Sequence, residues 1–272
     1  MPEYLAKNRY TTPTDPAAGV FQYTKGWKGD LFAYYDAHPE EGKTFNHMMG
    51  GVMQHQASWL DIYPHQISVD NASPDGVLLV DVGGNVGHDV SKFCQAHPEL
   101  ASRVVLQDRT DVVANAICPP AVRKMAHDFF NEQPVKGQYL LLPLSPFPPL
   151  LNIPFHSLIT TFLHPVGARL YYMHGVIHDW SDKPALEILK QIRSAMKPGY
   201  SKLLVHDHVV QDEGAHPHAT AYDLTMMVKV AGQERTEAMW RTLLGAAGFR
   251  VLKIWTSPLA AQSIVEAEPA DC

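Results

Sequence analysis

The segment 77–89, with the sequence VLLVDVGGNVGHD, places the strongest constraint on the fold of this chain. An apolar run reaches the acid Asp81, and a glycine-rich turn then leads into a helical pattern. Such a run is typical of a buried parallel strand, and open α/β sheets bind ligands at the carboxyl ends of these strands. Gly83 and Gly84 would let the backbone approach a ligand closely, with Asp81 facing it. The segment predicts an α/β fold with a binding turn; a turn without a ligand is the alternative.

The spacing of the glycines indicates the class of ligand. A dinucleotide-binding turn needs Gly-x-Gly-x-x-Gly, and this register from Gly83 meets Asn85 and His88 instead of glycines. A nicotinamide dehydrogenase is therefore disfavoured. The pattern Asp-x-Gly-x-Asn-x-Gly over residues 81–87 resembles the acid-x-Gly-x-Gly-x-Gly loop of S-adenosylmethionine (SAM) dependent methyltransferases. Asn85 departs from that loop, but asparagine tolerates a left-handed backbone better than most residues.

Composition narrows the partners and the setting. The length of 272 residues suits one large domain, or one domain with a smaller element. The net charge of −6 argues against binding to nucleic-acid phosphates. The three cysteines show no metal or redox spacing, which predicts a reduced, cytoplasmic setting. The start of the chain lacks a signal-peptide pattern, and no apolar run reaches membrane-spanning length, so we expect no membrane partner.

Two parts are expected along the chain. Residues 1–70 are predicted to be a loop up to about residue 30, followed by helices up to about residue 63. Residues 71–272 alternate strand and helix patterns, which predicts a mostly parallel sheet with right-handed crossovers, closed by an antiparallel strand. The predicted strands cover residues 77–82, 103–108, 124–129, 169–177, 202–210, 249–256 and 263–268.

Residues 138–167 interrupt this pattern. They contain no Asp, Glu, Lys or Arg, and they hold six prolines among many apolar residues. Repeated proline is incompatible with a long helix or a central strand. We expect an insertion foreign to the fold, either a translated intron or a true insertion. It should lie at the amino-terminal edge of the sheet and expose apolar surface.

Five short motifs follow one another in a fixed order, at residues 80–84, 107–108, 127–129, 178–182 and 233–236. Together they resemble small-molecule O-methyltransferases of the plant caffeate and flavonoid type and their fungal secondary-metabolism relatives. The resemblance implies a Rossmann-like SAM methyltransferase sheet. Such enzymes carry a winged-helix dimerisation domain ahead of the catalytic domain, and almost all of it is missing here. The homodimer that is usual in the family is therefore in doubt.

The resemblance also assigns roles to single residues. His178 would be the general base, oriented by Asp207 and Glu234. Asp108 is also indicated by its spacing, since it ends a predicted strand about twenty residues after the glycine turn, where such folds place a carboxylate on ribose hydroxyls. His174 stands where plant members carry a cofactor-contacting lysine. The expected cofactor contacts are Asp81, Gly83, Gly84, Asp108, Asp128, Phe129 and His174, and the expected acceptor contacts are Trp180, Met226 and Met227.

Several histidines near residue 206 raise the question of a metal. His206 and His208 share one face of a predicted strand, while Asp207 points to the other face. His216 and His218 follow shortly after. Because the acid and the histidines diverge, no metal site is expected.

The leading hypothesis is an enzyme that methylates a hydroxyl of a phenolic or polyketide-like small molecule with SAM as cofactor. A phenol titrates near 10 and a free imidazole near 6.5, so full proton transfer would be uphill by about 3.5 units, or roughly 5 kcal/mol. A carboxylate on the far ring nitrogen would reduce that cost. The competing hypotheses are a truncated, non-catalytic relative that keeps the fold, and a nicotinamide dehydrogenase.

Overall fold

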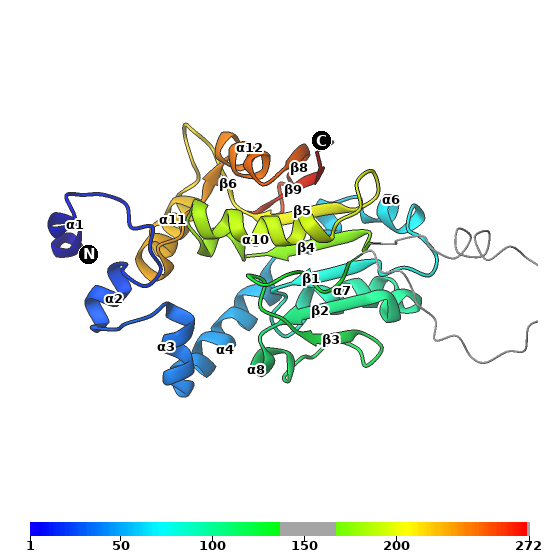
Figure 1. Ribbon diagram of the computed structural model, residues 1–272, viewed down its shortest axis with the longest axis horizontal. Helices are drawn as coiled ribbons and strands as arrows, with labels where there is room; N and C mark the ends of the chain where they lie inside the picture. The colour runs from blue at the N-terminus through cyan, green and yellow to red at the C-terminus, as the bar shows by residue number, and fades with distance from the viewer. Residues whose placement is uncertain (137–166, 271–272) are drawn as a thin grey trace, which may run out of the picture.

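A seven-stranded sheet forms the centre of the computed structural model, which describes residues 1–136 and 167–270 (Figure 1). The strand order is β3-β2-β1-β4-β5-β9-β8, and β9 is antiparallel to both of its neighbours while the other pairs are parallel. The predicted mostly parallel sheet with an antiparallel closing strand is confirmed. The strands are β1 (Leu79–Val82), β2 (Val104–Asp108), β3 (Arg123–Ala126), β4 (Leu170–His174), β5 (Lys202–Asp207), β8 (Phe249–Trp255) and β9 (Ser263–Pro269).

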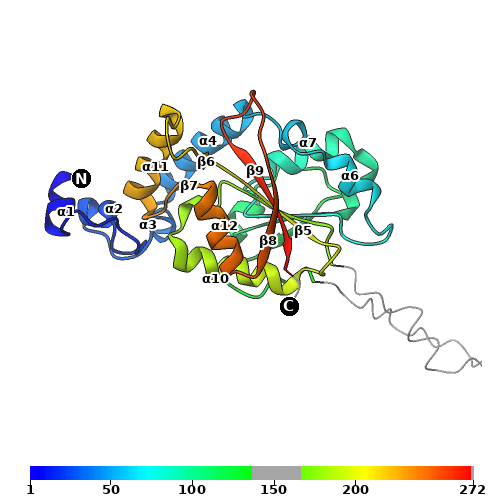
Figure 2. The same cartoon turned by 90° about the horizontal axis from the view of Figure 1, so that it is seen from above.

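Helices cover both faces of this sheet (Figure 2). Helices α10 (Asp182–Ala195) and α12 (Glu237–Ala246) pack on one face, and α7 (His88–Ala96) packs on the other with α6 (His65–Asp70) nearby. Each face has its own apolar core, because a strand buried on both sides presents alternate residues to the two layers. The shorter helical pieces are η1 (Pro98–Arg103), α8 (Thr110–Val113) and η2 (Ile177–Asp179).

The predicted strand over residues 202–210 is divided in two. β5 ends at Asp207, and β6 (Val209–Val210) leaves the main sheet to pair in parallel with β7 (Arg235–Thr236). Helix α11 (Pro217–Val230) connects the two short strands. The predicted strand over residues 169–177 also ends early, at His174, and the chain then turns into η2.

The loop predicted for residues 1–30 is wrong, since this stretch contains α1 (Pro2–Lys7) and α2 (Val20–Lys25). Proline suits the first turn of α1, and Gly26 ends α2 with a φ of 64° that favours glycine. The helical prediction that follows is confirmed as three pieces: α3 (Leu31–Ala37), α4 (Pro39–His55) and α5 (Trp59–Ile62). Helix α2 lies against α11, so the amino-terminal segment reaches the carboxyl-terminal half of the chain.

Nearly all of the predicted insertion lies outside the described residues. Its flanks are close together: the Tyr171 hydroxyl donates to the Val135 carbonyl at 2.6 Å, and the Ser201 hydroxyl donates to the Ala168 carbonyl at 2.7 Å. These contacts lie at the amino ends of β4 and β5, and the position expected for the insertion itself stays a prediction. The boundary near residue 70 and the nature of the insertion stay predictions. Every helix that the structure describes is too short or too polar to cross a lipid bilayer.

Replacing Trp59 with alanine should strongly destabilise the fold. Trp59 begins α5 and is fully buried, with its ring centroid 5.9 Å from that of Phe93 and 5.1 Å from that of Tyr172. Such a truncation costs about 3–5 kcal/mol of unfolding free energy. Leu259→Ala is the control, since Leu259 is 81% exposed. Urea denaturation measures both, and equal midpoints would show that the amino-terminal helices are not part of the core.

Candidate active site

The glycine turn after β1 has the left-handed backbone that its sequence predicts. The φ angles are 73° at Gly83, 53° at Asn85 and 90° at Gly87, so Asn85 does adopt the conformation expected of it. The Asn85 N–H donates to Asp108 Oδ2 at 2.7 Å, which joins the turn to the end of β2. A Cβ on Gly84 would lie 2.3 Å from Asp81 Oδ2, so this position has no room for a side chain.

A cavity of about 1090 Å³ opens at the carboxyl ends of β1 to β4. The glycine turn forms one wall, and the ends of β2, β3 and β4 form the floor. Helices α3 and α4 supply the opposite wall. The residues predicted to bind ligands that do line it are Gly83, Gly84, Asp108, Asp128, Phe129, His174 and Trp180.

The residues of the opposite wall were not among the predicted ligand contacts. Phe32, Tyr35, Phe45 and Met49 line the cavity from α3 and α4. Their helical spacing was visible in the sequence, but the same spacing equally fits core packing. Arg109 also lies at the rim, where its guanidinium contacts Asp36 of α3 at 2.5 Å.

Asp81 does not line the cavity, contrary to expectation. The side chain is buried below Gly84, and neither carboxyl oxygen has a hydrogen-bond partner among the described residues. Burial raises the pKa of Asp81 well above its usual range, and the charges of Asp89 and Asp108 add to the effect. A buried acid with this environment is protonated more readily than a surface acid.

His174 reaches the cavity wall, but both of its ring nitrogens are engaged by protein atoms. Nδ1 lies 2.6 Å from Asp89 Oδ2, and Nε2 lies 3.0 Å from Gln262 Oε1. Burial lowers the pKa of His174, but the charge of Asp89 and the hydrogen bonds to Asp89 and Gln262 together outweigh burial, and the net shift is upward. The contact with Asp89 therefore favours the protonated form of His174.

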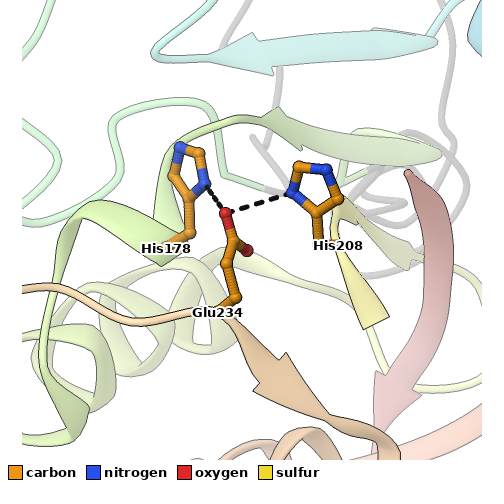
Figure 3. A group of neighbouring side chains, drawn as sticks. All are labelled: His178, His208 and Glu234. Atoms are coloured by element: carbon orange, nitrogen blue, oxygen red, sulfur yellow. Dashed lines mark hydrogen bonds and ion pairs between the residues drawn. The ribbon is translucent and has the colours of Figure 1, made fainter. Parts of the chain in front are cut away.

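His178 lies on η2, where it meets a carboxylate from a distant part of the chain (Figure 3). Its Nδ1 is 2.8 Å from Glu234 Oε1, and Nδ1 of His208 is 3.1 Å from the same oxygen. Because a carboxylate accepts hydrogen bonds, Nδ1 is the donor in both rings. That arrangement leaves Nε2 of a neutral His178 as the basic nitrogen.

Nε2 of His178 is directed towards the cavity wall. A Cβ on Gly175, which lines the cavity, would lie 3.6 Å from this nitrogen. His178 itself is 7% exposed and lies just behind the lining residues Gly175 and Asp179. Nε2 is therefore close to the cavity wall at Gly175, although His178 itself is buried and does not line the cavity.

Asp207 joins this cluster without a hydrogen bond to His178. Its Oδ1 is 3.9 Å from His178 Nδ1, and both of its oxygens lack partners among the described residues. Burial raises the pKa of the Asp207 carboxyl. Asp207 therefore acts on His178 through its charge, whereas Glu234 accepts a hydrogen bond from His178.

The charges around His178 favour its protonated form. Burial lowers the pKa of the imidazole, but the charges of Asp207, Glu234 and Asp179 outweigh burial and raise it to about 10. Asp179 Oδ1 is 3.6 Å from Nε2, and burial raises the pKa of Asp179 to about 6. These contacts make His178 a stronger base than a free imidazole.

The segment 232–235 fixes the position of the η2 turn. The Gln233 N–H donates to the His178 carbonyl at 2.9 Å. The fully buried Arg235 guanidinium donates to the Ile177 carbonyl at 3.2 Å and the Trp180 carbonyl at 2.7 Å. Glu234 lies between these two anchors, so its carboxylate is held where His178 needs it.

The four histidines considered for a metal site, His206, His208, His216 and His218, do not form a common ligand group among the described residues. His206 forms a hydrogen bond between its Nδ1 and the Tyr172 hydroxyl at 2.8 Å. His216 and His218 are exposed. A different set, His178, His208 and Glu234, has ligand atoms within 4.8 Å of one another and could hold a divalent cation. The two hydrogen bonds to Glu234 Oε1 already account for that geometry.

Met226 and Met227 are half-buried on α11 and do not line the cavity. The backbone carbonyl of Met226 accepts from the Gly232 N–H at 3.2 Å, which ties α11 to the segment that carries Glu234. Contact of these methionines with an acceptor stays a prediction.

Comparison with known proteins agrees with this geometry. The profile of the O-methyltransferase domain family matches residues 161–250. O-methyltransferase mfmE of Annulohypoxylon moriforme is 52% identical over 268 residues, which is 98% of this chain. Over nearly its whole length the chain is therefore similar to fungal O-methyltransferases. It spans 59% of the length of mfmE.

Solved structures share the fold of this chain. OxaC, crystallised with sinefungin and meleagrin, matches 98% of the chain with a TM-score of 0.80 and 24% identity. LepI in complex with SAM matches 98% of the chain with a TM-score of 0.79 and 24% identity. The chain covers 61% of OxaC and 62% of LepI.

Replacing Gly232 with alanine should disturb the site. A Cβ there would lie 2.2 Å from the His178 carbonyl oxygen and 2.6 Å from the Asp179 carbonyl carbon, so the η2 turn must move. We expect a loss of about 1–3 kcal/mol of unfolding free energy. Gly245→Ala is the matched control: it lies in α12 with open space around it, and alanine should be neutral or stabilise by up to about 1 kcal/mol. Denaturant titration measures both, and equal effects would contradict the close approach.

Proposed function

We propose that this chain transfers a methyl group from SAM to a hydroxyl of a phenolic or polyketide-like small molecule, with His178 as the general base. The observation that carries the proposal is the place of His178: Nε2 beside the cavity that the glycine turn bounds, and Nδ1 bonded to Glu234. General-base help of this kind is worth about 10²–10⁴ in rate.

The groups around the cavity fit SAM. Each oxygen of Asp108 already accepts one backbone N–H, from Asn85 or Arg109, and keeps a lone pair for a ribose hydroxyl. Asp128 and Phe129 offer an acceptor and an aromatic face for an adenine ring. The negative charge of Asp108 and Asp89 at the wall favours a cation. When bound, SAM supplies an electrophilic methyl group on a positively charged sulfur.

The base is suited to a phenol. An unperturbed imidazole is about 3.5 units less basic than a phenolate, a gap of roughly 5 kcal/mol. The carboxylates around His178 raise its pKa to about 10, which removes most of this gap. The acceptor's proton would pass to Nε2, and Glu234 would hold the opposite Nδ1–H so that the ring keeps its orientation.

The remaining wall of the cavity suits a flat aromatic acceptor. Phe32, Tyr35, Phe45 and Met49 face the cavity, together with Trp180. Aromatic and sulfur-bearing side chains favour ring-shaped ligands. The volume of about 1090 Å³ leaves space for an acceptor beside a nucleoside. Contacts of the acceptor with Met226 and Met227, and a cytoplasmic setting, remain part of the proposal.

The hydrogen bond between His178 and Glu234 favours turnover over a non-catalytic relative. A protein that had lost catalysis would have no reason to keep a buried carboxylate on the far nitrogen, because burying such a group costs several kcal/mol unless it is paired. The glycine spacing continues to disfavour a nicotinamide dehydrogenase.

Asp108→Asn should weaken SAM binding by about tenfold or more. A hydrogen bond to a charged group is worth about 1.5–3 kcal/mol, and the amide keeps the shape but loses the charge. Titration calorimetry with SAM measures the effect, with Asp75→Asn, an exposed acid distant from the cavity, as the control. NAD serves as the comparison ligand. Binding of NAD in place of SAM would overturn the cofactor assignment.

Methyl transfer should increase with pH. Because the pKa of His178 is raised, its imidazolium form predominates below that value, and the neutral base appears only as pH rises through it. The positive charge of SAM opposes the imidazolium, so we expect an apparent pKa between about 6.5 and 10. Below it, kcat/KM should rise tenfold per pH unit, as measured with labelled SAM and a panel of phenols.

His178→Ala should lower kcat by about 10²–10⁴ while SAM binding is retained. His216→Ala is the control, since His216 is exposed and lies away from Glu234. Full activity of His178→Ala, or a rate independent of pH in the wild type, would show that His178 is not the base.

A further inference from the structure

His208 is a second histidine on the carboxylate that holds the proposed base. Its Nδ1 lies 3.1 Å from Glu234 Oε1, the same oxygen that His178 Nδ1 approaches at 2.8 Å (Figure 3). His208 is buried and does not line the cavity. It therefore cannot contact a ligand there, and any effect on the reaction must pass through Glu234.

The backbone sets this contact. β6 and β7 pair in parallel, with Val209 opposite Arg235 and Val210 opposite Thr236. His208 and Glu234 each precede the first of these pairs, so the register brings them side by side. The His208 carbonyl accepts from Trp240 Nε1 at 3.1 Å, and the Glu234 N–H donates to Asp223 Oδ1 at 2.9 Å. Both backbone segments are thus also hydrogen-bonded to residues outside the β6–β7 pair.

The surroundings of Glu234 make the donor from His208 important. Glu234 is buried, its Oε2 has no partner among the described residues, and Asp207 beside it has none on either oxygen. A buried carboxylate needs donors to remain charged and in one orientation. Oε1 receives two, one from each imidazole. Without His208, the whole charge of Glu234 would act on His178 and hold its proton more tightly.

We infer that His208 is a positioning residue for the base: its Nδ1–H fixes the Glu234 carboxylate and takes up part of its charge, so that His178 releases its proton at a lower pH. The inference rests on the proposed function, because it concerns the same base. The titratable and charged groups that face the cluster are Asp179 on η2, Asp207 at the end of β5, Arg235 on β7, and His218, Tyr222 and Asp223 on α11.

Three substitutions at one position test this. Asparagine places its side-chain N–H close to the position of Nδ1, glutamine places its N–H further out, and alanine has no donor. We expect the pH profile of kcat/KM to move upward by about one unit in His208→Ala, since a hydrogen bond to a charged group is worth at least about tenfold. His208→Gln should move similarly, and His208→Asn should recover most of the shift.

His218→Ala is the matched control. Its ring centroid is 5.6 Å from that of His208, but it is exposed and makes no contact with Glu234. The profile of this variant should coincide with that of the wild type. If His208→Ala fails to fold, the pH profiles of His208→Asn and His208→Gln test the inference instead. Both side chains are polar amides, and they differ in length. Equal profiles for asparagine and glutamine would overturn the inference.

A second measurement separates this inference from the proposed function. The titration of the His178 imidazole can be followed by ¹⁵N nuclear magnetic resonance of the full chain without any acceptor. An upward shift in His208→Ala, reversed in His208→Asn, supports the positioning role even if no phenol is methylated; an unchanged titration overturns it. Elemental analysis that found a divalent metal in stoichiometric amount, lost in His208→Ala, would also overturn it, because both Nδ1 atoms would then be ligands instead of donors.

Discussion

The site depends on one close contact, between the segment 232–235 and the η2 turn. Gly232 lets the two backbones approach, Gln233 bonds the His178 carbonyl, and Arg235 bonds the carbonyls on either side of it. The remaining residue of the segment is Glu234. Its side chain points towards the His178 imidazole, from which it accepts a hydrogen bond. A buried acid–base pair is stable only when its geometry is fixed in this way, because each group otherwise keeps its desolvation cost without a partner.

The second constraint is the number of acids at this edge of the sheet. Asp81, Asp89, Asp207 and Glu234 are all buried. Asp89 lies beside His174 and Lys92, and Asp207 and Glu234 lie beside His178, whereas the Asp81 carboxyl has no hydrogen-bond partner among the described residues. Some of these carboxyls must take up protons or meet a cation. An excess of buried negative charge beside a cavity favours a positively charged ligand, and it also explains why an imidazole there becomes strongly basic.

Much of this arrangement follows from sequence, and the exceptions have physical reasons. The apolar run and the glycine turn predicted β1 and the helix that begins at His88. Both signals depend only on residues that are close together in the sequence. The helices α1 and α2 were missed because so short a helix depends on burial of residues such as Tyr4 and Val20 against the rest of the chain. The contact of His208 with Glu234 could not be predicted from the sequence, since it depends on how the two-residue strands β6 and β7 align with each other.

The sheet by itself does not select a reaction, because similar sheets serve different chemistry. What narrows the choice is the need for a proton acceptor. A reaction that moves no proton gains nothing from an imidazole whose far nitrogen is bonded to a buried carboxylate, and the burial of that carboxylate would be a cost without return. Methylation of a hydroxyl releases one proton for each methyl group transferred. In the function proposed here, the paired His178 and Glu234 beside the cavity would supply the acceptor that this stoichiometry requires.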